Sequence, residues 1–593
     1  MKKLTQTLIL CLLLTGLAID VSAQKVTRPR VSQPSPDNLN KIFGRCGCEN
    51  CGGRLEHNDP IEEGENNFQL VNRWTFTTLS GGGLGQGDPT MVTWSIIPDG
   101  TDANGGPGFV PSNLIAVFDN LFNEANAGSP DLTNRFWHGL IQDALDRWGE
   151  VSGLEYVYEP NDDGTTNFGA GGVLGVRGDV RIGGFNIDGG GNVLAFNSFP
   201  NTGDMAIDTA DTGTYGNASL GYRLFRNVFT HEQGHGIGFA HLQSNNAAFL
   251  MEPFISGAFD GPQIDDILAA HRQYGDVLEK ENGFQGNDSF ANAIELGTIA
   301  DGSTTTIGTD GATGTFVAAD DTDFVSVDDN SDADYYKFTV TELGFVDIVL
   351  TPVGATYNQS PEGGAGNIPI NQAERSDLTL SLFNSSLTPI QASNTAPAGS
   401  PESILDEFLV PGEYFVRATG SANTVQLYTL SVSAEALEVP APTAPALVAY
   451  TSGETSDGDV ADLLDSDDVS LDIIPNLDGA PDEEPIVALF SFFSPDVLVS
   501  TFSVNFEGSG NSPNLHQSLS IFNRDTGLFE EFSSGAVGLS DGTVNFVPGG
   551  DPQRFVSVPS GLVLIEARYD TTGPVLFYPW TISIDRLVIN TLD

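Results

Sequence analysis

Three histidines and one glutamate within an eleven-residue segment constrain this chain more than any other feature of its sequence. His231, Glu232, His235 and His241 form the pattern His-Glu-x-x-His-x-x-Gly-x-x-His, with Gly238 before the last histidine. On a helix, positions i and i+4 share one face, so the first two imidazoles can bind one ion. Gly238 can adopt a positive φ, which lets the chain turn and bring His241 round as third ligand. The pattern predicts one catalytic zinc with a fourth position for water.

Glu232 is the predicted general base because it directly follows the first histidine. Its carboxylate can accept the proton of a zinc-activated water and later pass that proton to a leaving amine. The competing interpretation is a core helix whose histidines only pack. It is disfavoured because three of the chain's seven histidines stand in register here. The motif therefore predicts an enzyme.

The extended motif resembles the zinc signature of the metzincin metallopeptidases, a clan with a methionine turn beneath the metal. Met251, ten residues beyond His241, fits that turn. Over residues 67–276 the surroundings are most similar to the matrixins. This resemblance implies an α+β catalytic domain with a twisted mixed sheet and three helices. It also implies a zinc metalloendopeptidase that hydrolyses peptide bonds in proteins.

Local patterns within residues 67–276 agree with this resemblance. Apolar residues repeat at helical spacing over 136–148, and the segment 262–275 is similar to the closing matrixin helix. The segment 91–97 resembles the first matrixin strand. Short segments bounded by Gly and Asn turns are further expected strands, at 180–183, 193–196 and 204–208. We expect the strand at 193–196 to lie at a sheet edge and to hold substrate as an added strand.

A glycine-rich acidic loop is similar to the calcium loop of matrixins. Carboxylate and carbonyl oxygens suit Ca²⁺, whereas an acidic turn in solvent is the alternative interpretation. The expected calcium ligands are Asp188, Gly189, Gly191, Asp208 and Asp211.

Matrixins usually hold a second, structural zinc through histidines in this part of the domain. The corresponding positions here are Phe196 and Ala206, so we expect a single zinc.

The N-terminal residues predict export. Lys2 and Lys3, an apolar run over 8–17 and a small-residue site ending at Ala23 are typical of a secretory signal peptide, residues 1–23. The chain is therefore expected to be secreted.

Residues 24–66 are the expected propeptide and contain a cluster of three cysteines. The segment around Cys46 resembles the core of the matrixin cysteine switch, which implies that its thiolate blocks the zinc. The flanking prolines and the aspartate of that motif are missing. A disulfide among Cys46, Cys48 and Cys51, or a metal knot that includes His57, are the alternatives.

Two all-β sandwich domains are expected downstream. Residues 286–435 resemble the bacterial pre-peptidase C-terminal module, on the strength of 287–293, 332–340 and 411–417. A Pro-rich linker over 436–446 separates this module from a second β-sandwich or jelly roll at 447–593. These domains are candidates for binding protein or carbohydrate surfaces.

Charge restricts the partners further. With 79 acidic and 24 basic residues the net charge is −55, which opposes binding to nucleic acid, and no stretch beyond the signal region is apolar enough to span a membrane. The rival function is an inactive metzincin-like adhesion or matrix-binding protein. Glu232 favours the enzyme, since a binding module does not need that residue. A zinc hydrolase of non-peptide substrates is disfavoured because the resemblance extends past the metal ligands.

Overall fold

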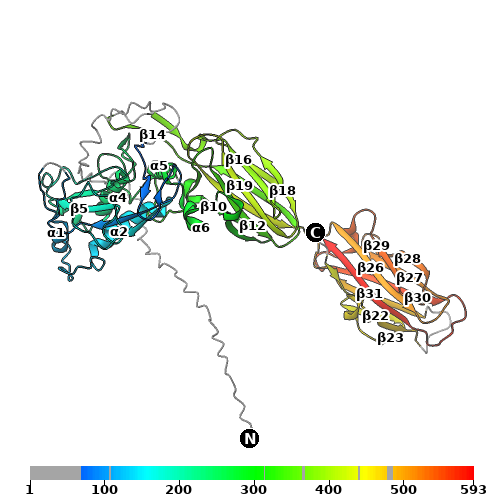
Figure 1. Ribbon diagram of the computed structural model, residues 1–593. Coiled ribbons are helices and arrows are strands. Elements are labelled where there is room, and N and C mark those ends of the chain that lie inside the picture. The colour runs from blue at the N-terminus through cyan, green and yellow to red at the C-terminus, as the bar shows by residue number, and fades with distance from the viewer. Residues whose placement is uncertain are drawn as a thin grey trace, which may run out of the picture. The chain divides into compact units, whose positions relative to one another are not determined.

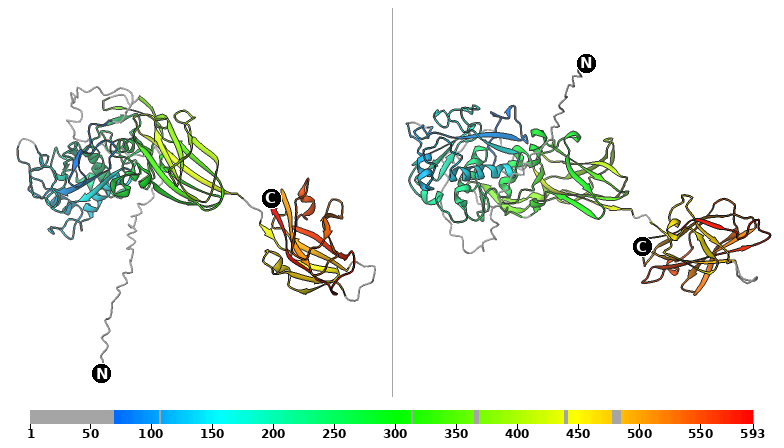
Figure 2. Two further views of the ribbon diagram at one scale, coloured as in Figure 1. Left: turned by 45° about the vertical axis from the view of Figure 1, so that its right-hand side comes forward. Right: turned by 90° about the horizontal axis from the view of Figure 1, so that it is seen from below.

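The computed structural model describes residues 69–105, 108–312, 314–363, 368–437, 441–476 and 485–592. The chain divides into two compact units, residues 1–436 and 437–593 (Figures 1 and 2). The expected signal peptide, the expected propeptide and Cys46 lie outside the described residues. Within the described residues, no helix is long and apolar enough to cross a membrane.

A mixed sheet forms the framework of the region that carries the histidine motif. Its strand order is β4-β3-β5-β7-β6. All neighbouring pairs are parallel except β6 and β7, which are antiparallel. The strands are β3 (Thr90–Ile96), β4 (Leu154–Tyr158), β5 (Val180–Phe185), β6 (Ala195–Asn197) and β7 (Met205–Asp208). The strand expected at 193–196 is thus β6 at the end of the sheet, opposite β7, with Phe196 facing Ala206.

Helices pack against this sheet through buried aromatic and aliphatic side chains. In α2 (Phe136–Glu150) the apolar residues expected at helical spacing are buried, apart from Phe136. Trp148 of this helix donates its Nε1 proton to the carbonyl oxygen of Thr230 on α4 (2.9 Å), which fixes the two helices together. The helices of the region are α1 (Leu114–Leu121), α2, α3 (Thr212–Tyr215), α4 (Arg223–Gly236), α5 (Ile264–Tyr274) and α6 (Glu281–Phe284).

Helix α5 begins and ends where the sequence supplies caps. Gln263 and Asp266 form a capping box, in which the Asp266 carboxylate accepts from the Gln263 backbone N–H (2.8 Å). Gly275 ends the helix with a φ of +71°, which glycine adopts without strain. A short hairpin, β1 (Phe76–Thr77) with β2 (Gly81–Gly82), precedes the main sheet.

The region after α6 is built from two sheets that share one hydrophobic core. The first contains β10 (Ser303–Ile307), β11 (Val325–Val327), β13 (Gly344–Pro352), β18 (Glu402–Leu409) and β20 (Gln426–Ala436). The second contains β9 (Ile294–Ile299), β12 (Ala333–Val340), β16 (Leu378–Asn384), β17 (Pro389–Ser393) and β19 (Gly412–Gly420). Alternating burial along β12 and β13 directs one face of each strand into that core.

One hairpin of this β-rich region pairs with the histidine-bearing region. It consists of β14 (Thr356–Pro361) and β15 (Ile368–Asn371), and β14 also pairs antiparallel with β8 (Leu242–Ser244). We call β14, β15 and the described residues up to Gly363 the arm. Figure 1 shows β14 close to α5. The two regions expected as separate domains therefore share a sheet.

The second unit is also composed of two sheets around a core of its own. One contains β21 (Pro442–Thr443), β23 (Glu454–Asp457), β24 (Leu471–Ile474), β26 (Thr501–Gly510), β29 (Gly542–Phe546) and β31 (Ile582–Leu592). The other contains β22 (Leu447–Ser452), β25 (Ile486–Phe493), β27 (Leu515–Asn523), β28 (Leu528–Ala536) and β30 (Leu562–Thr571).

Acidic side chains gather in the segment that joins α5 to the β-rich region. Oxygens of Glu279, Asp288 and Asp332 lie within 4.8 Å of one another. Burial, together with the charges of Asp276 and Asp332, raises the pKa of Glu279 to about 10. Between its ordinary pKa near 4.5 and this raised value, the folded chain binds more protons than the unfolded chain. The free energy of unfolding therefore falls as pH rises through this window.

This fall in the free energy of unfolding with rising pH predicts the effect of Glu279→Gln. An amide carries no charge at any pH, so in calcium-free buffer the variant should unfold at least about 2 °C above the wild type near pH 8, and the difference should shrink towards pH 5. Thermal unfolding followed by circular dichroism measures this. Glu281→Gln, at an exposed neighbouring position, is the control and should show no such pH-dependent gain. A wild-type protein that is more stable than the variant at pH 8 would contradict the prediction.

Candidate metal centre

Helix α4 presents the first part of the motif on its last turns. His231, Glu232 and His235 are all buried on this helix, which ends at Gly236. The four-residue spacing brings the two imidazoles to one side, with ring centroids 5.0 Å apart. The local sequence therefore fixes two of the three candidate ligands through helical periodicity alone.

The third histidine returns to the helix because the chain reverses at Gly238. Its φ is +102°, and a Cβ at this position would stand 1.6 Å from the Asn72 carbonyl oxygen. The Phe239 backbone N–H donates to the Gly234 carbonyl oxygen (2.9 Å), which closes the turn. Only glycine suits both the conformation and the close approach. His241 is thereby directed at the other two rings.

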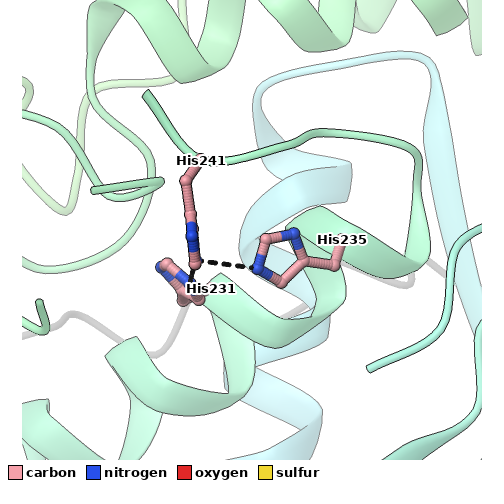
Figure 3. A group of neighbouring side chains, drawn as sticks. All are labelled: His231, His235 and His241. Atoms are coloured by element: carbon pink, nitrogen blue, oxygen red, sulfur yellow. Dashed lines mark hydrogen bonds between the residues drawn. The ribbon is translucent and has the colours of Figure 1, made fainter. Parts of the chain in front are cut away.

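The three imidazoles converge through their Nε2 atoms (Figure 3). Nε2 of His241 lies 3.3 Å from Nε2 of His231 and 3.2 Å from Nε2 of His235. Two nitrogens that each bind zinc at about 2.0–2.1 Å in tetrahedral geometry stand about 3.3 Å apart. All three histidines are buried, with residue exposures of 3% for His231, 0% for His235 and 4% for His241. The triad therefore has the donors and the spacing to bind a metal such as zinc.

The outward ring nitrogens of the first two histidines are held by backbone carbonyls. Nδ1 of His231 lies 2.6 Å from the Leu250 oxygen, and Nδ1 of His235 lies 2.6 Å from the Phe239 oxygen. A carbonyl oxygen only accepts, so each Nδ1 carries the proton and donates it. In a neutral ring this makes Nε2 the lone-pair nitrogen, which is the form that binds a metal.

Met251 lies beneath the motif helix, as the resemblance implies. A Cβ at Gly234 would stand 2.3 Å from the Met251 sulfur, so the helix has room for this turn only because residue 234 is glycine. The Asp266 carboxylate accepts hydrogen bonds from the backbone N–H groups of Leu250 (2.8 Å) and Met251 (3.1 Å). Burial raises the pKa of Asp266 to about 6, although these hydrogen bonds act in the opposite direction. Helix α5 therefore fixes the methionine turn.

Glu232 is buried on helix α4, directly after His231. The Asn197 side chain, on β6, donates to the Glu232 backbone carbonyl (2.6 Å). This bond ties the edge strand to the motif helix at the residue that carries the carboxylate. Sequence reasoning missed Asn197, because an amide on a short strand has no motif around it.

The expected calcium ligands lie on one loop and the strand end opposite. The Asp188 backbone N–H donates to the Asp208 carboxylate (3.1 Å), and that of Gly191 donates to Asp211 (2.7 Å). Burial raises the pKa of Asp211 to about 6, and the nearby charges of Asp208 and Asp188 contribute to this. Gly189 and Gly191 both have a positive φ.

Among the described residues, two sets of side chains bring metal-ligating atoms within 4.8 Å of one another. They are the histidine triad and the set of Glu279, Asp288 and Asp332. The carboxylates of the expected calcium loop are not among them, so that loop stays a prediction.

Glu362 is the second residue that sequence reasoning missed. Its Oε2 lies 3.0 Å from Nδ1 of His241, on the side of the ring that faces away from the triad. Glu362 follows β14, 121 residues beyond the histidine and in a region expected to be a separate domain. No spacing rule links two positions so far apart along the chain.

Part of the chain matches a known protein family. Residues 121–275 match the family model of the matrixins. Human matrix metalloproteinase-26 is 27% identical over 166 residues, which cover 26% of this chain and 56% of that protein. The chain therefore spans little more than half the length of this relative. The matrixin resemblance predicted from the sequence is confirmed over these residues.

Two solved structures are similar to parts of this chain. The pre-peptidase C-terminal domain of a collagenase from Bacillus anthracis matches 24% of this chain and 94% of that chain, at 17% identity and a TM-score of 0.15. The N-terminal CBM22 tandem domain of Xyn10C from Paenibacillus barcinonensis matches 49% of this chain and 91% of that chain, at 12% identity and a TM-score of 0.25. At these TM-scores neither likeness carries an argument about function. The chain thus carries a matrixin domain, followed by a largely β-rich region with several sheets.

Proposed function

We propose that this protein is a secreted zinc-dependent metalloendopeptidase that hydrolyses peptide bonds in proteins. The single observation that carries the proposal is the convergence of three Nε2 atoms at the spacing of tetrahedral zinc ligands. The matrixin match over residues 121–275 supports the same class of enzyme. Residues His231, His235 and His241 would hold the metal.

The chemistry divides between the metal and the protein. Zinc bound at this triad supplies a Lewis acid that lowers the pKa of water and polarises a carbonyl group. Glu232 accepts the proton of the attacking water and returns it to the amine that leaves. The position of Glu232 on the helix that carries His231 and His235, and its burial there, support this role. Strand β6 is the terminal strand of its sheet, which suits a substrate bound as an added strand.

Further features of the chain belong to the proposal. The loop at Asp188–Asn192 with Asp208 and Asp211 binds calcium and stabilises the domain. The signal at residues 1–23 directs secretion, and Cys46 in the segment 24–66 keeps the enzyme latent. The two β-rich regions attach the enzyme to protein or carbohydrate surfaces. The negative net charge of the chain opposes binding to nucleic acid and to anionic membranes.

Glu232→Gln should separate metal binding from catalysis. The amide cannot accept the water's proton, whereas the imidazoles are untouched. We therefore expect wild-type zinc content with a loss of at least about 100-fold in kcat/KM on a fluorogenic peptide. Glu155→Gln, at an exposed position on β4, is the matched control and should keep full activity. A zinc-loaded Glu232→Gln enzyme with substantial activity would refute the assigned base.

Calcium should raise the unfolding temperature of the zinc-loaded protein, because a ligand that binds only the folded state stabilises that state. We expect Asp208→Asn to abolish this calcium-dependent rise. Differential scanning calorimetry at increasing calcium concentrations measures the unfolding temperature. Glu279→Gln serves as the comparison variant, because it alters the other acidic cluster. A calcium response that survives Asp208→Asn and disappears in Glu279→Gln would reject the loop as the calcium site.

Cys46→Ala should release latency. A soft thiolate binds zinc well, and attachment within the same chain gives it a high effective concentration. We expect the Cys46→Ala precursor to cleave peptide before any processing, whereas Cys48→Ala and Cys51→Ala precursors stay inactive. The comparison uses freshly expressed precursors under reducing conditions. Full activity in the unmodified precursor would leave the cysteines as a disulfide or a metal knot.

A further inference from the structure

The register of one strand pair places a carboxylate beside the third histidine. Strand β14 pairs antiparallel with β8, with Gln359 opposite Ser244, Ser360 opposite Gln243 and Pro361 opposite Leu242. One further step in this register sets Glu362 opposite His241. Directly opposed residues on one face have Cβ atoms about 4.5–5.5 Å apart, close enough for their side chains to meet. The observed contact of 3.0 Å is therefore a product of the strand pairing.

The arm that carries Glu362 is anchored in the matrixin domain by buried contacts. Tyr357 packs on Phe249, with ring centroids 4.9 Å apart, and its hydroxyl donates to the carboxylate of Asp265 on α5. Gln372 donates to the same hydroxyl (2.7 Å). Tyr357 and Ile370 both belong to the hydrophobic core of that domain. The position of Glu362 is therefore set by packed side chains and by a sheet.

The three imidazoles differ in what holds their outward nitrogens. His231 and His235 donate to carbonyl oxygens of their own domain, whereas His241 donates to a carboxylate from the arm. A carboxylate that accepts from Nδ1 orients the ring and makes Nε2 a stronger donor to a metal. A charged acceptor also gives a stronger hydrogen bond than a neutral one. His241, the ligand that follows the turn at Gly238, thus has the strongest hydrogen-bond acceptor of the three.

A simple surface ion pair is the alternative interpretation of this contact. Such pairs contribute little when both partners are exposed. Here the His241 side chain is 2% exposed and that of Glu362 is 26% exposed. The imidazole has one buried outward nitrogen, and Glu362 accepts from it. The contact therefore sits behind a candidate metal ligand and not on open surface.

We propose that Glu362 is a positioning residue for the metal centre, through which the β-rich region completes the support of the third zinc ligand. The inference rests on the proposed zinc function. Glu362 holds the proton of His241 on Nδ1 and turns Nε2 towards the other two imidazoles. The matrixin domain alone supplies the three ligands, but the orientation of one of them depends on the arm.

Zinc affinity in the full-length chain tests this inference directly. We expect Glu362→Ala to raise the zinc dissociation constant by about 10–100-fold, measured by competition with a chromophoric chelator. Glu362→Gln keeps an oxygen acceptor without the charge and should show a smaller increase. Glu374→Gln, an exposed position just after β15, is the matched control and should bind zinc like the wild type.

Two further readouts separate positioning from folding. The thermal unfolding of the metal-free Glu362→Ala chain should match that of the wild type, because the arm keeps its packed contacts. In cobalt-substituted protein, the visible absorption bands should change in Glu362→Ala and not in Glu374→Gln, since these bands report ligand geometry. Unchanged zinc affinity and an unchanged cobalt spectrum in Glu362→Ala would overturn the inference. A wild-type chain that binds no zinc would overturn the proposed function together with this inference. Failure of the inference alone is therefore distinct, because the wild type then still binds zinc.

Discussion

The orientation of three imidazole rings is the constraint on which the rest of the site depends. A metal-binding imidazole almost always donates a hydrogen bond from its other nitrogen, and the acceptor of that bond fixes the orientation of the ring. Leu250, Phe239 and Glu362 supply those acceptors, and each comes from a different part of the chain. The methionine turn, the turn at Gly238 and the arm are therefore all parts of one arrangement, since each holds one outward nitrogen in place.

Features set by short-range geometry could be predicted from the sequence. The helical spacing of His231 and His235 and the turn at Gly238 depend on neighbouring residues only. The edge strand β6 was also expected, from Gly and Asn turns on either side of a short apolar segment. The family resemblance then supplied the mixed sheet and the role of Met251, which local patterns alone do not give.

Features set by long-range pairing were not predictable in the same way. Glu362 and Asn197 act through contacts with residues far away along the chain, and neither lies in a recognisable motif. The sharing of a sheet between β8 and β14 was missed for the same reason. Composition and linker signals indicate where one domain ends and the next begins along the chain. They contain no information on which strands pair in the folded structure. The acidic loop lies between these two cases. Its carboxylates are close enough for the charges of Asp208 and Asp188 to raise the pKa of Asp211, but they are not among the described sets whose ligand atoms lie within 4.8 Å of one another.

The antiparallel register between β14 and β8 restricts how this architecture can change during evolution. Modular extensions of secreted enzymes are often exchanged, lost or inserted as whole units. Here the loss of the β-rich region would remove an acceptor from inside the metal site, and a single-residue insertion after Pro361 would turn the carboxylate to the opposite face of the strand. The two regions are therefore expected to be inherited together, as a pair with a fixed spacing between β14 and Glu362.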